Sequence, residues 1–360
     1  MKIRLGLSDF TPYSWEASTR EVASTNGLKV SQIHRMDTNT SPYIPKEALS
    51  SLAHEAGKLP VNEYPDTTYL ELRSALADYT KTMVDQIVLT NGADEALDII
   101  AKLLLDPKDE VLIPTPTYSM YRIASQLANA KVIRIPRDST FDISPDSIAR
   151  RVSKRTKLLF MCNPNNPTGN STSSEQIRSI LESNRNLTVV IDEAYSEFSR
   201  KSSSKLVDDH NNLVIVRTLS KAFSMAGIRV GYIISSVDST KKINLVRPPN
   251  SLGVLSLFMA QRALEHVGTM RKNVNLIIKE RERMSRVISG ICEVFPSEAN
   301  FVLFRPRKSA KKLHSRMMKK GFVLREFSGV SMIEDCLRVT VNTPSVNSSF
   351  LKALAKELQA

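Results

Sequence analysis

Residues 213–232 read L-V-I-V-R-T-L-S-K-A-F-S-M-A-G-I-R-V-G-Y, and this stretch decides the fold. Apolar, mostly β-branched residues predict a buried strand over residues 213–216, and a similar run follows at residues 230–234. Ser220, Lys221 and Arg229 lie between these two strands. A lysine flanked by apolar residues is poorly hydrated, which lowers the pKa of its amine and makes it a nucleophile. A hydroxyl and a guanidinium nearby suit a phosphate.

Two further polar segments follow predicted strands. Asp192 comes directly after residues 187–191, with Tyr195 three positions later, and Asn166 lies in an Asn- and Pro-rich loop after residues 157–162. A carboxylate at the end of a wholly apolar strand is costly to bury unless it meets a cation. Taken alone, Asp192 also fits a helix cap or a buried salt bridge, and the loop also fits an ordinary turn.

A third segment follows the strand predicted over residues 86–90. Gly92 permits a tight turn there, and Ala93 and Asp94 then open a helix whose free N–H groups suit an anion. Alone, this pattern is also typical of an ordinary helix start. Ligands of α/β sheets bind at the carboxyl ends of the strands, so we expect these segments to meet around Lys221.

The middle of the chain alternates apolar runs with helical periodicity, which predicts an α/β fold with a mostly parallel sheet covered by helices on both faces. The predicted strands are residues 86–90, 110–113, 131–135, 157–162, 187–191, 213–216 and 230–234. The predicted helices are residues 93–105, 119–130, 147–152 and 174–183.

The pattern divides the chain into four parts. Residues 1–45 form an N-terminal arm that belongs with a small domain or lies across a partner subunit, and residues 46–255 form the large ligand-binding domain. Residues 256–290 form one long linking helix, and residues 291–360 form a small α+β domain. Its predicted elements are strands at residues 300–304, 322–325 and 337–341 and helices at residues 309–320 and 348–358.

Composition narrows the class of protein. The 360 residues are 41% hydrophobic and 24% charged, as in a globular protein, and the formal charge is +13. The positive residues are spread along the chain, and the basic cluster at residues 308–320 is typical of a solvated helix face, so we expect no nucleic acid partner. The start of the chain lacks the apolar core of a secretion signal and no stretch is long enough to cross a membrane, which favours the cytoplasm. The spacing of the three cysteines predicts neither a disulfide framework nor a metal site.

Together these segments fit one ligand that carries a phosphate, an aromatic nitrogen and an aldehyde. The pattern S-K-x-x-x-x-x-G-x-R-x-G after a strand is specific, whereas each of the other segments has an ordinary structural reading. We identify this ligand as pyridoxal 5′-phosphate, whose ring acts as an electron sink.

The sequence resembles the fold-type-I pyridoxal-phosphate transferases, and within them the histidinol-phosphate aminotransferases. The resemblance runs from about residue 12 to the last predicted helix. It is carried by N-E-Y-P-D (62–66), N-G-A-D-E (91–95), P-T-Y-S-M-Y (116–121), N-P-N-N-P-T-G (163–169), D-E-A-Y-S-E-F (192–198) and R-T-L-S-K-A-F-S-M-A-G-I-R-V-G-Y (217–232). It implies a large domain with a mostly parallel central sheet and a small α+β domain.

The resemblance also implies roles at the cofactor. Lys221 bonds to the cofactor aldehyde and moves the proton of the substrate, and Asp192 pairs with the ring nitrogen. Tyr195 and Asn166 bind the ring hydroxyl, and Tyr118 stacks on the ring. The cofactor phosphate is bound by Ala93, Asp94, Ser220, Arg229 and, from a neighbouring subunit, Tyr64, which implies a homodimer.

On the substrate side, the resemblance implies an amino donor and 2-oxoglutarate as substrates of a two-stage, ping-pong reaction. Arg338 matches the arginine that binds the substrate carboxylate, or the phosphate of histidinol phosphate, and Arg325 matches a second arginine associated with that phosphate. Asn39 and Tyr13 complete the expected substrate-binding residues. Without the resemblance, the two arginines also fit exposed positions at strand ends.

One segment departs from the family pattern. The early L-x-x-N-E-N-P-Y motif appears here as M-D-T-N-T-S-P-Y (36–43), with Thr40 and Ser41 in place of Glu and Asn. We expect histidinol phosphate as the amino donor. The alternatives are that the protein is an aromatic amino acid aminotransferase or a threonine-phosphate-type decarboxylase of the same fold. A non-catalytic sensor domain is a further alternative, against which the complete set of Lys221, Asp192 and Arg229 argues.

Overall fold

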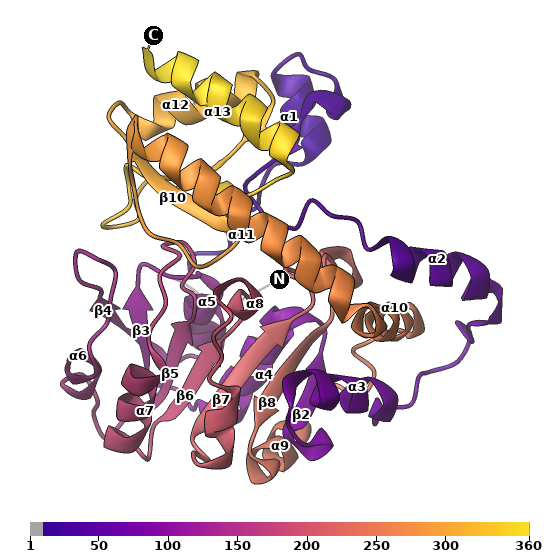
Figure 1. The fold of residues 1–360 in the computed structure, drawn as a ribbon. Helices are drawn as coiled ribbons and strands as arrows, with labels where there is room; N and C mark the ends of the chain where they lie inside the picture. The colour runs from indigo at the N-terminus through magenta and orange to yellow at the C-terminus, as the bar shows by residue number, and fades with distance from the viewer. Residues whose placement is uncertain (1–9, 360) are drawn as a thin grey trace, which may run out of the picture.

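The computed structural model describes residues 10–359, and Figure 1 shows the large domain below and the small domain above. The first nine residues of the predicted N-terminal arm lie outside the described part. The expected absence of a secretion signal falls on the same residues. No helix among the described residues is long and apolar enough to span a membrane.

The large domain is built on a seven-stranded sheet with the strand order β2-β8-β7-β6-β5-β3-β4. Strands β4, β3, β5, β6 and β7 are parallel to one another, and β8 is antiparallel to both β7 and β2. The strands are β2 (Ile87–Thr90), β3 (Glu110–Thr115), β4 (Lys131–Pro136), β5 (Thr156–Cys162), β6 (Thr188–Asp192), β7 (Leu213–Thr218) and β8 (Gly231–Ser235). This is the mostly parallel sheet that the sequence predicts.

The central strands are continuous apolar runs because helices cover both faces of the sheet. In Figure 1, α4 lies behind the sheet and α7 lies in front of it. The helices of this domain are α2 (Lys46–Glu55), α3 (Leu70–Thr80), α4 (Gly92–Leu104), α5 (Met120–Leu127), α6 (Pro145–Ala149), α7 (Ser174–Ser183), α8 (Ser196–Ser199), α9 (Val237–Asn244) and α10 (Val254–Glu265).

The small domain is a four-stranded antiparallel sheet with the order β12-β13-β10-β9, packed against helices. Its strands are β9 (Cys292–Val294), β10 (Phe301–Pro306), β12 (Arg325–Glu326) and β13 (Leu337–Thr340), and its helices are α12 (Ala310–Lys319) and α13 (Pro344–Gln359). The N-terminal segment joins it, because β1 (His34–Arg35) pairs in parallel with β11 (Phe322–Val323), next to α1 (Thr19–Thr25).

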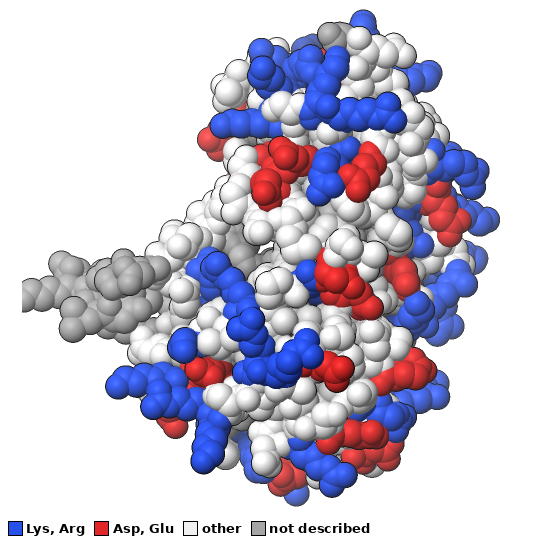
Figure 2. Space-filling model, turned by 90° about the vertical axis from the view of Figure 1, so that its left-hand side faces the viewer, with Lys and Arg blue, Asp and Glu red and all other residues white. Residues whose placement is uncertain are grey.

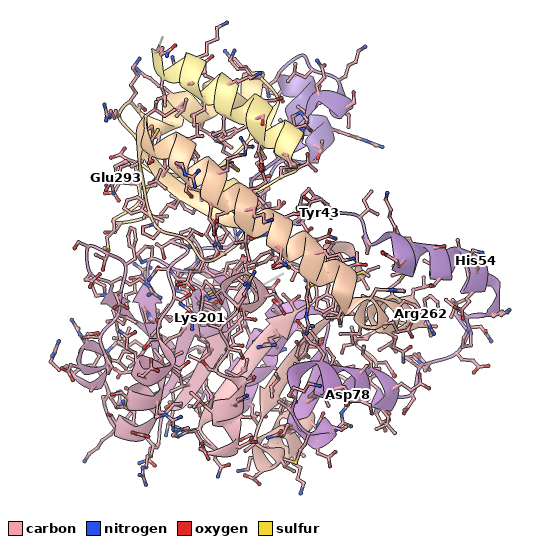
Figure 3. All side chains as sticks on the ribbon, in the orientation of Figure 1. Tyr43, His54, Asp78, Lys201, Arg262 and Glu293 are labelled. Carbon is pink, nitrogen blue, oxygen red and sulfur yellow. The ribbon has the colours of Figure 1, made fainter. Side chains whose placement is uncertain are left out.

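The prediction of one long linking helix was wrong in one respect. The helical stretch is divided at His266, whose backbone (φ −109°, ψ 32°) is not helical, into α10 and α11 (Val267–Ser289). Helix α10 packs on α2 and α3 of the large domain, whereas α11 packs on β9, β10 and α13. Figure 3 shows this change of direction between Arg262 on α10 and Glu293 just beyond α11. Helix α11 also packs on α8 of the large domain, so α11 and not α10 connects the two domains.

Charge is dispersed on the face shown in Figure 2. Lys and Arg side chains lie over both the small and the large domain there, and Asp and Glu side chains lie among them. The positive charge of this face is therefore not gathered into one stripe.

Candidate active site

A cavity of about 360 Å³ lies where the carboxyl ends of the large-domain strands face the small domain. Thirteen of the fourteen residues predicted to bind cofactor or substrate line it, and these are Tyr13, Asn39, Ala93, Asp94, Tyr118, Asn166, Asp192, Tyr195, Ser220, Lys221, Arg229, Arg325 and Arg338. The exception is Tyr64, whose side chain is 85% exposed in the loop before α3. The single chain thus brings together residues from the N-terminal segment and both domains.

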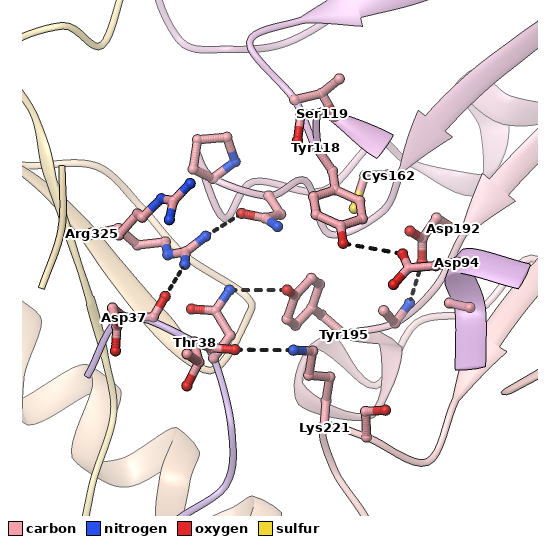
Figure 4. Close-up of a pocket in the computed structure, with 18 of the residues that line it drawn as sticks. Asp37, Thr38, Asp94, Tyr118, Ser119, Cys162, Asp192, Tyr195, Lys221 and Arg325 are labelled. Carbon is pink, nitrogen blue, oxygen red and sulfur yellow. Dashed lines mark hydrogen bonds between the residues drawn. The ribbon is translucent and has the colours of Figure 1, made fainter. Parts of the chain in front are cut away.

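Lys221 lies in the loop that follows β7 and points across the cavity. Its amine donates a hydrogen bond to the backbone carbonyl of Thr38 at 3.2 Å and lies 5.9 Å from the centroid of the Tyr195 ring (Figure 4). Removal from water, followed by repulsion from Arg338, lowers the pKa of Lys221 to about 8. A substantial fraction of this amine is therefore neutral near physiological pH.

Asp192 is the last residue of β6 and is buried at the opposite end of the cavity from Arg325 (Figure 4). One oxygen accepts a hydrogen bond from the Tyr121 hydroxyl at 2.7 Å, and the other accepts one from the backbone N–H of Ala194 at 3.0 Å. Burial raises the pKa of Asp192 to about 6, although both hydrogen bonds act in the opposite direction. A carboxylate in this environment calls for a cation opposite it.

The start of α4 forms a cradle of donors. Gly92 has a left-handed backbone (φ +76°), and a Cβ there would lie 2.5 Å from the Arg229 guanidinium. Glycine therefore lets Arg229 approach the free N–H groups at the start of this helix. The Ser220 hydroxyl lies close by, in contact with the Thr218 hydroxyl at 2.8 Å. Two backbone amides, a hydroxyl and a guanidinium are a suitable donor set for a phosphate.

Between Asp192 and the small domain lies a layer of aromatic and amide side chains. The Tyr195 hydroxyl accepts a hydrogen bond from the Asn39 amide at 3.0 Å, which leaves its own proton available to a ligand. The Tyr118 hydroxyl donates to Asp94 at 3.1 Å. Asn39 is fixed in turn by Thr340 of β13, which bonds both its backbone N–H and its side-chain oxygen.

Two arginines of the small domain reach the other side of the cavity. Arg338 on β13 is buried, and its guanidinium donates to the Asn166 amide oxygen and to the backbone carbonyl of Asp37. Its Nε is shielded from solvent and has no hydrogen-bond partner among residues 10–359. Arg325 on β12 instead forms an ion pair with Glu16 at 2.8 Å, and the Tyr13 hydroxyl donates to the same carboxylate oxygen at 3.0 Å.

The sequence did not single out three residues of this site. Tyr121 was quoted in the P-T-Y-S-M-Y motif without a role, and its position three residues after Tyr118 was the available signal. The contact of Thr38 is made by a backbone carbonyl, which no side-chain pattern reveals. Glu16 lies close to Tyr13 in sequence, but nothing in the sequence indicated its distant partner Arg325.

The residues present fit pyridoxal phosphate. The donor cradle at the start of α4 suits its phosphate, the buried Asp192 suits a protonated ring nitrogen, and Lys221 lies in the same cavity to meet its aldehyde. Asn166 and the Tyr195 hydroxyl lie in the same cavity and suit the ring hydroxyl. Each group of the cofactor therefore has a complementary partner in one cavity.

Comparison with known proteins agrees with this reading. Residues 28–356 match the family model described as aminotransferase class I and II. A histidinol-phosphate aminotransferase of Caldanaerobacter subterraneus subsp. tengcongensis is 37% identical over 90% of this chain and 93% of its own.

Solved structures show the same fold. A histidinol-phosphate aminotransferase of Sinorhizobium meliloti in complex with pyridoxal-5′-phosphate superposes with a TM-score of 0.90 at 22% identity, covering 100% of this chain and 98% of that one. An L-threonine-O-3-phosphate decarboxylase of Porphyromonas gingivalis gives 0.78 at 25% identity, covering 91% and 99%. With the family model and the donor set of the cavity, these matches place the chain: it belongs to the class I and II aminotransferases, and its cofactor is pyridoxal 5′-phosphate.

Proposed function

We propose that this protein transfers the amino group of L-histidinol phosphate to 2-oxoglutarate, in histidine biosynthesis. The observation that carries the proposal is Arg338, which lines the same cavity as Lys221 and whose guanidinium donates there, among the described residues, only to two neutral oxygens. A buried guanidinium whose partners carry no charge calls for an anion, and a substrate phosphate or carboxylate supplies one. The 37% identical relative that is named for this reaction supports the choice of donor.

The proposed roles follow from the contacts of each side chain. The cofactor, when bound, withdraws electrons from the substrate carbon that carries the amine. Lys221, with its pKa lowered to about 8, would be the base that takes the proton from that carbon and the acid that later gives it up. Asp192 holds the ring nitrogen as a cation, and the hydroxyl of Tyr121 and the amide of Ala194 fix the orientation of this carboxylate.

Other residues of the cavity would bind and orient the cofactor and the substrate. We propose that Ala93, Asp94, Ser220 and Arg229 hold the cofactor phosphate, that Asn166 and Tyr195 bind the ring hydroxyl and that Tyr118 covers the ring. Arg338 and Arg325 would bind the anionic end of the substrate, and Asn39 and Tyr13 lie on the same side. All of these residues line the one cavity.

We also propose that the protein acts as a homodimer in which Tyr64 reaches the cofactor phosphate of the neighbouring subunit. Val61 and Leu70 on the same stretch of chain, and Leu245 on a second segment, are apolar side chains between 55% and 81% exposed. The segments that carry them are joined by a hydrogen bond from Arg247 to the carbonyl of Thr67 at 2.9 Å. An apolar surface of this kind is typical of a protein interface, and a second copy would cover it and bring Tyr64 to a cofactor.

The domain boundaries belong to the same proposal. Residues 46–265 would form the large cofactor-binding domain and residues 291–360 the small domain, joined by α11 (Val267–Ser289). The N-terminal segment up to residue 45 would act with the small domain, as the pairing of β1 with β11 supports.

A direct assay tests the donor. The purified holoenzyme would be mixed with histidinol phosphate, phenylalanine or tyrosine, each with 2-oxoglutarate, and glutamate formation would be measured. We expect the highest kcat/KM with histidinol phosphate. Equal or better turnover of an aromatic amino acid would contradict the proposed donor and leave the aminotransferase assignment in place.

A second candidate is decarboxylation of a phosphorylated amino acid. It is favoured by the likeness to the threonine-phosphate decarboxylase structure, at 25% identity, and by the exchange of the motif residues for Thr40 and Ser41. Incubation with O-phospho-L-threonine distinguishes the two reactions, since a decarboxylase releases carbon dioxide without consuming 2-oxoglutarate.

A further inference from the structure

Glu16 lines the part of the cavity that we propose binds the substrate, and its carboxylate forms an ion pair with Arg325, one of the two arginines there. Its Oε1 accepts a hydrogen bond from Arg325 at 2.8 Å and another from the Tyr13 hydroxyl at 3.0 Å. The side chains of Glu16 and Arg325 are 25% and 26% exposed, so the pair is partly shielded from water. Its mutual attraction is therefore stronger than that of a fully exposed pair.

The other arginine differs from Arg325 in this respect. The partners of Arg338 are an amide oxygen and a backbone carbonyl, which carry no net charge. The nearby Asp37 carboxylate is held by Arg35 at 2.6 Å and 2.8 Å. Arg338 is thus available to an anion, whereas the charge of Arg325 is balanced within the protein.

We propose that Glu16 is a specificity-determining residue, an internal anion that the anionic group of a substrate must displace from Arg325. This inference rests on the proposed function, in which Arg325 binds the substrate phosphate. A phosphate carries up to two negative charges and competes for the guanidinium better than a carboxylate with one. Glu16 thereby disfavours substrates whose far end is neutral or weakly charged, since specificity arises as much from repulsion as from attraction.

The contact with Tyr13 extends the argument. Its hydroxyl now donates to the same Glu16 oxygen that binds Arg325, so departure of the carboxylate frees two donors together. An incoming phosphate would then receive the Arg325 N–H and the Tyr13 O–H in place of Glu16. The exchange is a substitution of one anion for another, with the number of charge-assisted hydrogen bonds maintained.

The test measures binding of inorganic phosphate to the holoenzyme by calorimetry, with the cofactor in place so that its own phosphate site is filled. Glu16→Gln keeps the size of the side chain and removes its charge, and Glu16→Ala removes both. We expect both variants to bind phosphate roughly threefold to tenfold more tightly than the unaltered holoenzyme, because the competing charge is gone.

Two controls make the result specific. Glu21→Gln removes one negative charge from α1, and glutamine still supports the capping contact with Ser18, so phosphate affinity should stay unchanged. In an Arg325→Gln background, Glu16→Gln should give no gain, because the two residues act as a pair. Unchanged affinity in Glu16→Gln, or a gain that persists without Arg325, would overturn the proposal.

The same measurement separates this inference from the proposed function. Phosphate binding does not depend on which amino donor the enzyme uses. If histidinol phosphate fails as a donor while Glu16→Gln still gains affinity, only the choice of donor is wrong. If histidinol phosphate is turned over and the gain is absent, only the role of Glu16 is wrong.

Discussion

The amine of Lys221 donates a hydrogen bond to the backbone carbonyl of Thr38, 3.2 Å away and 183 positions earlier in the chain. Lys221 belongs to the loop after β7, and Thr38 belongs to the N-terminal segment just beyond β1. This contact places the N-terminal segment directly over the predicted nucleophile. It also leaves the amine hydrogen-bonded to a neutral group, so that burial and Arg338 can lower its pKa.

Replacement of Lys221 should separate binding from chemistry. In Lys221→Ala, the phosphate cradle of Ala93, Ser220 and Arg229 is intact, so the protein should still bind the cofactor. Transamination should fall by about 10³-fold or more, because Lys221 is the only lysine among the described residues that line the cavity. Cofactor absorbance and glutamate formation, measured on the same sample, check both halves. A variant that retained turnover would end the proton-transfer role.

Asp192 should lower the free energy of unfolding of the cofactor-free protein at neutral pH. Its pKa rises from 3.8 to about 6 on folding, so the folded protein holds the proton more tightly than the unfolded chain. The protonated Asp192 side chain makes its full contribution to stability below about pH 4, and this contribution is lost as the pH rises through about 6. Relative to a neutral side chain, Asp192 then costs about 3 kcal/mol at pH 7.5.

Urea unfolding of the cofactor-free protein checks this sign. Asp192→Asn should raise the free energy of unfolding at pH 7.5 and leave it nearly unchanged at pH 4. Asp78→Asn on α3 is the matched control, since it makes the same substitution at an exposed aspartate and should leave the free energy of unfolding at pH 7.5 nearly unchanged. A variant at Asp192 that is less stable at pH 7.5 would contradict the burial argument.

Arg338→Gln should act mainly on substrate binding. The charge that meets the substrate anion is lost, and KM for the donor should rise by about 100-fold, which corresponds to roughly 3 kcal/mol for a buried charge-assisted pair. Arg338→Lys should recover part of the loss, because it restores the charge without the planar guanidinium. Steady-state kinetics that give kcat and KM separately test whether Arg338 acts on substrate binding. A large fall in kcat at unchanged KM would show that Arg338 serves the chemical step instead.

The exposed position of Tyr64 permits a complementation test. Tyr64→Ala and Lys221→Ala should each be nearly inactive, because each lacks one part of every site. In a mixed dimer, one site combines both defects and the other has neither. Unfolding and refolding the two variants together should therefore restore about a quarter of full activity. Failure to restore activity, with mixed dimers present, would contradict a shared site.

The sequence predicted the large-domain sheet well because buried parallel strands are continuous apolar runs that need no partner information. It also predicted that Asp94, Asn166, Asp192 and Lys221 meet in one cavity, since the carboxyl ends of parallel strands share one edge. The substrate-side residues were implied only by the family resemblance. The break at His266 was missed because helical periodicity continues on both sides of it, without proline at the break. That break reflects packing on two different domains, which is a tertiary property.

The remaining gaps concern partners distant in sequence. Glu16 and Arg325 are 309 positions apart, and neither residue carries a local signal of the other. The hydrogen bond to the Thr38 carbonyl involves the backbone, which every residue shares. Such contacts follow from the assembled fold and from no shorter segment of the chain.

The central claim is that Lys221 is the amine that holds the cofactor in this cavity, and reduction with borohydride tests it most directly. Reduction should fix the cofactor to the protein, and peptide mass spectrometry should find the added mass on the peptide that contains Lys221. Cofactor mass on a different lysine, or no fixed cofactor from a yellow holoenzyme, would contradict the account.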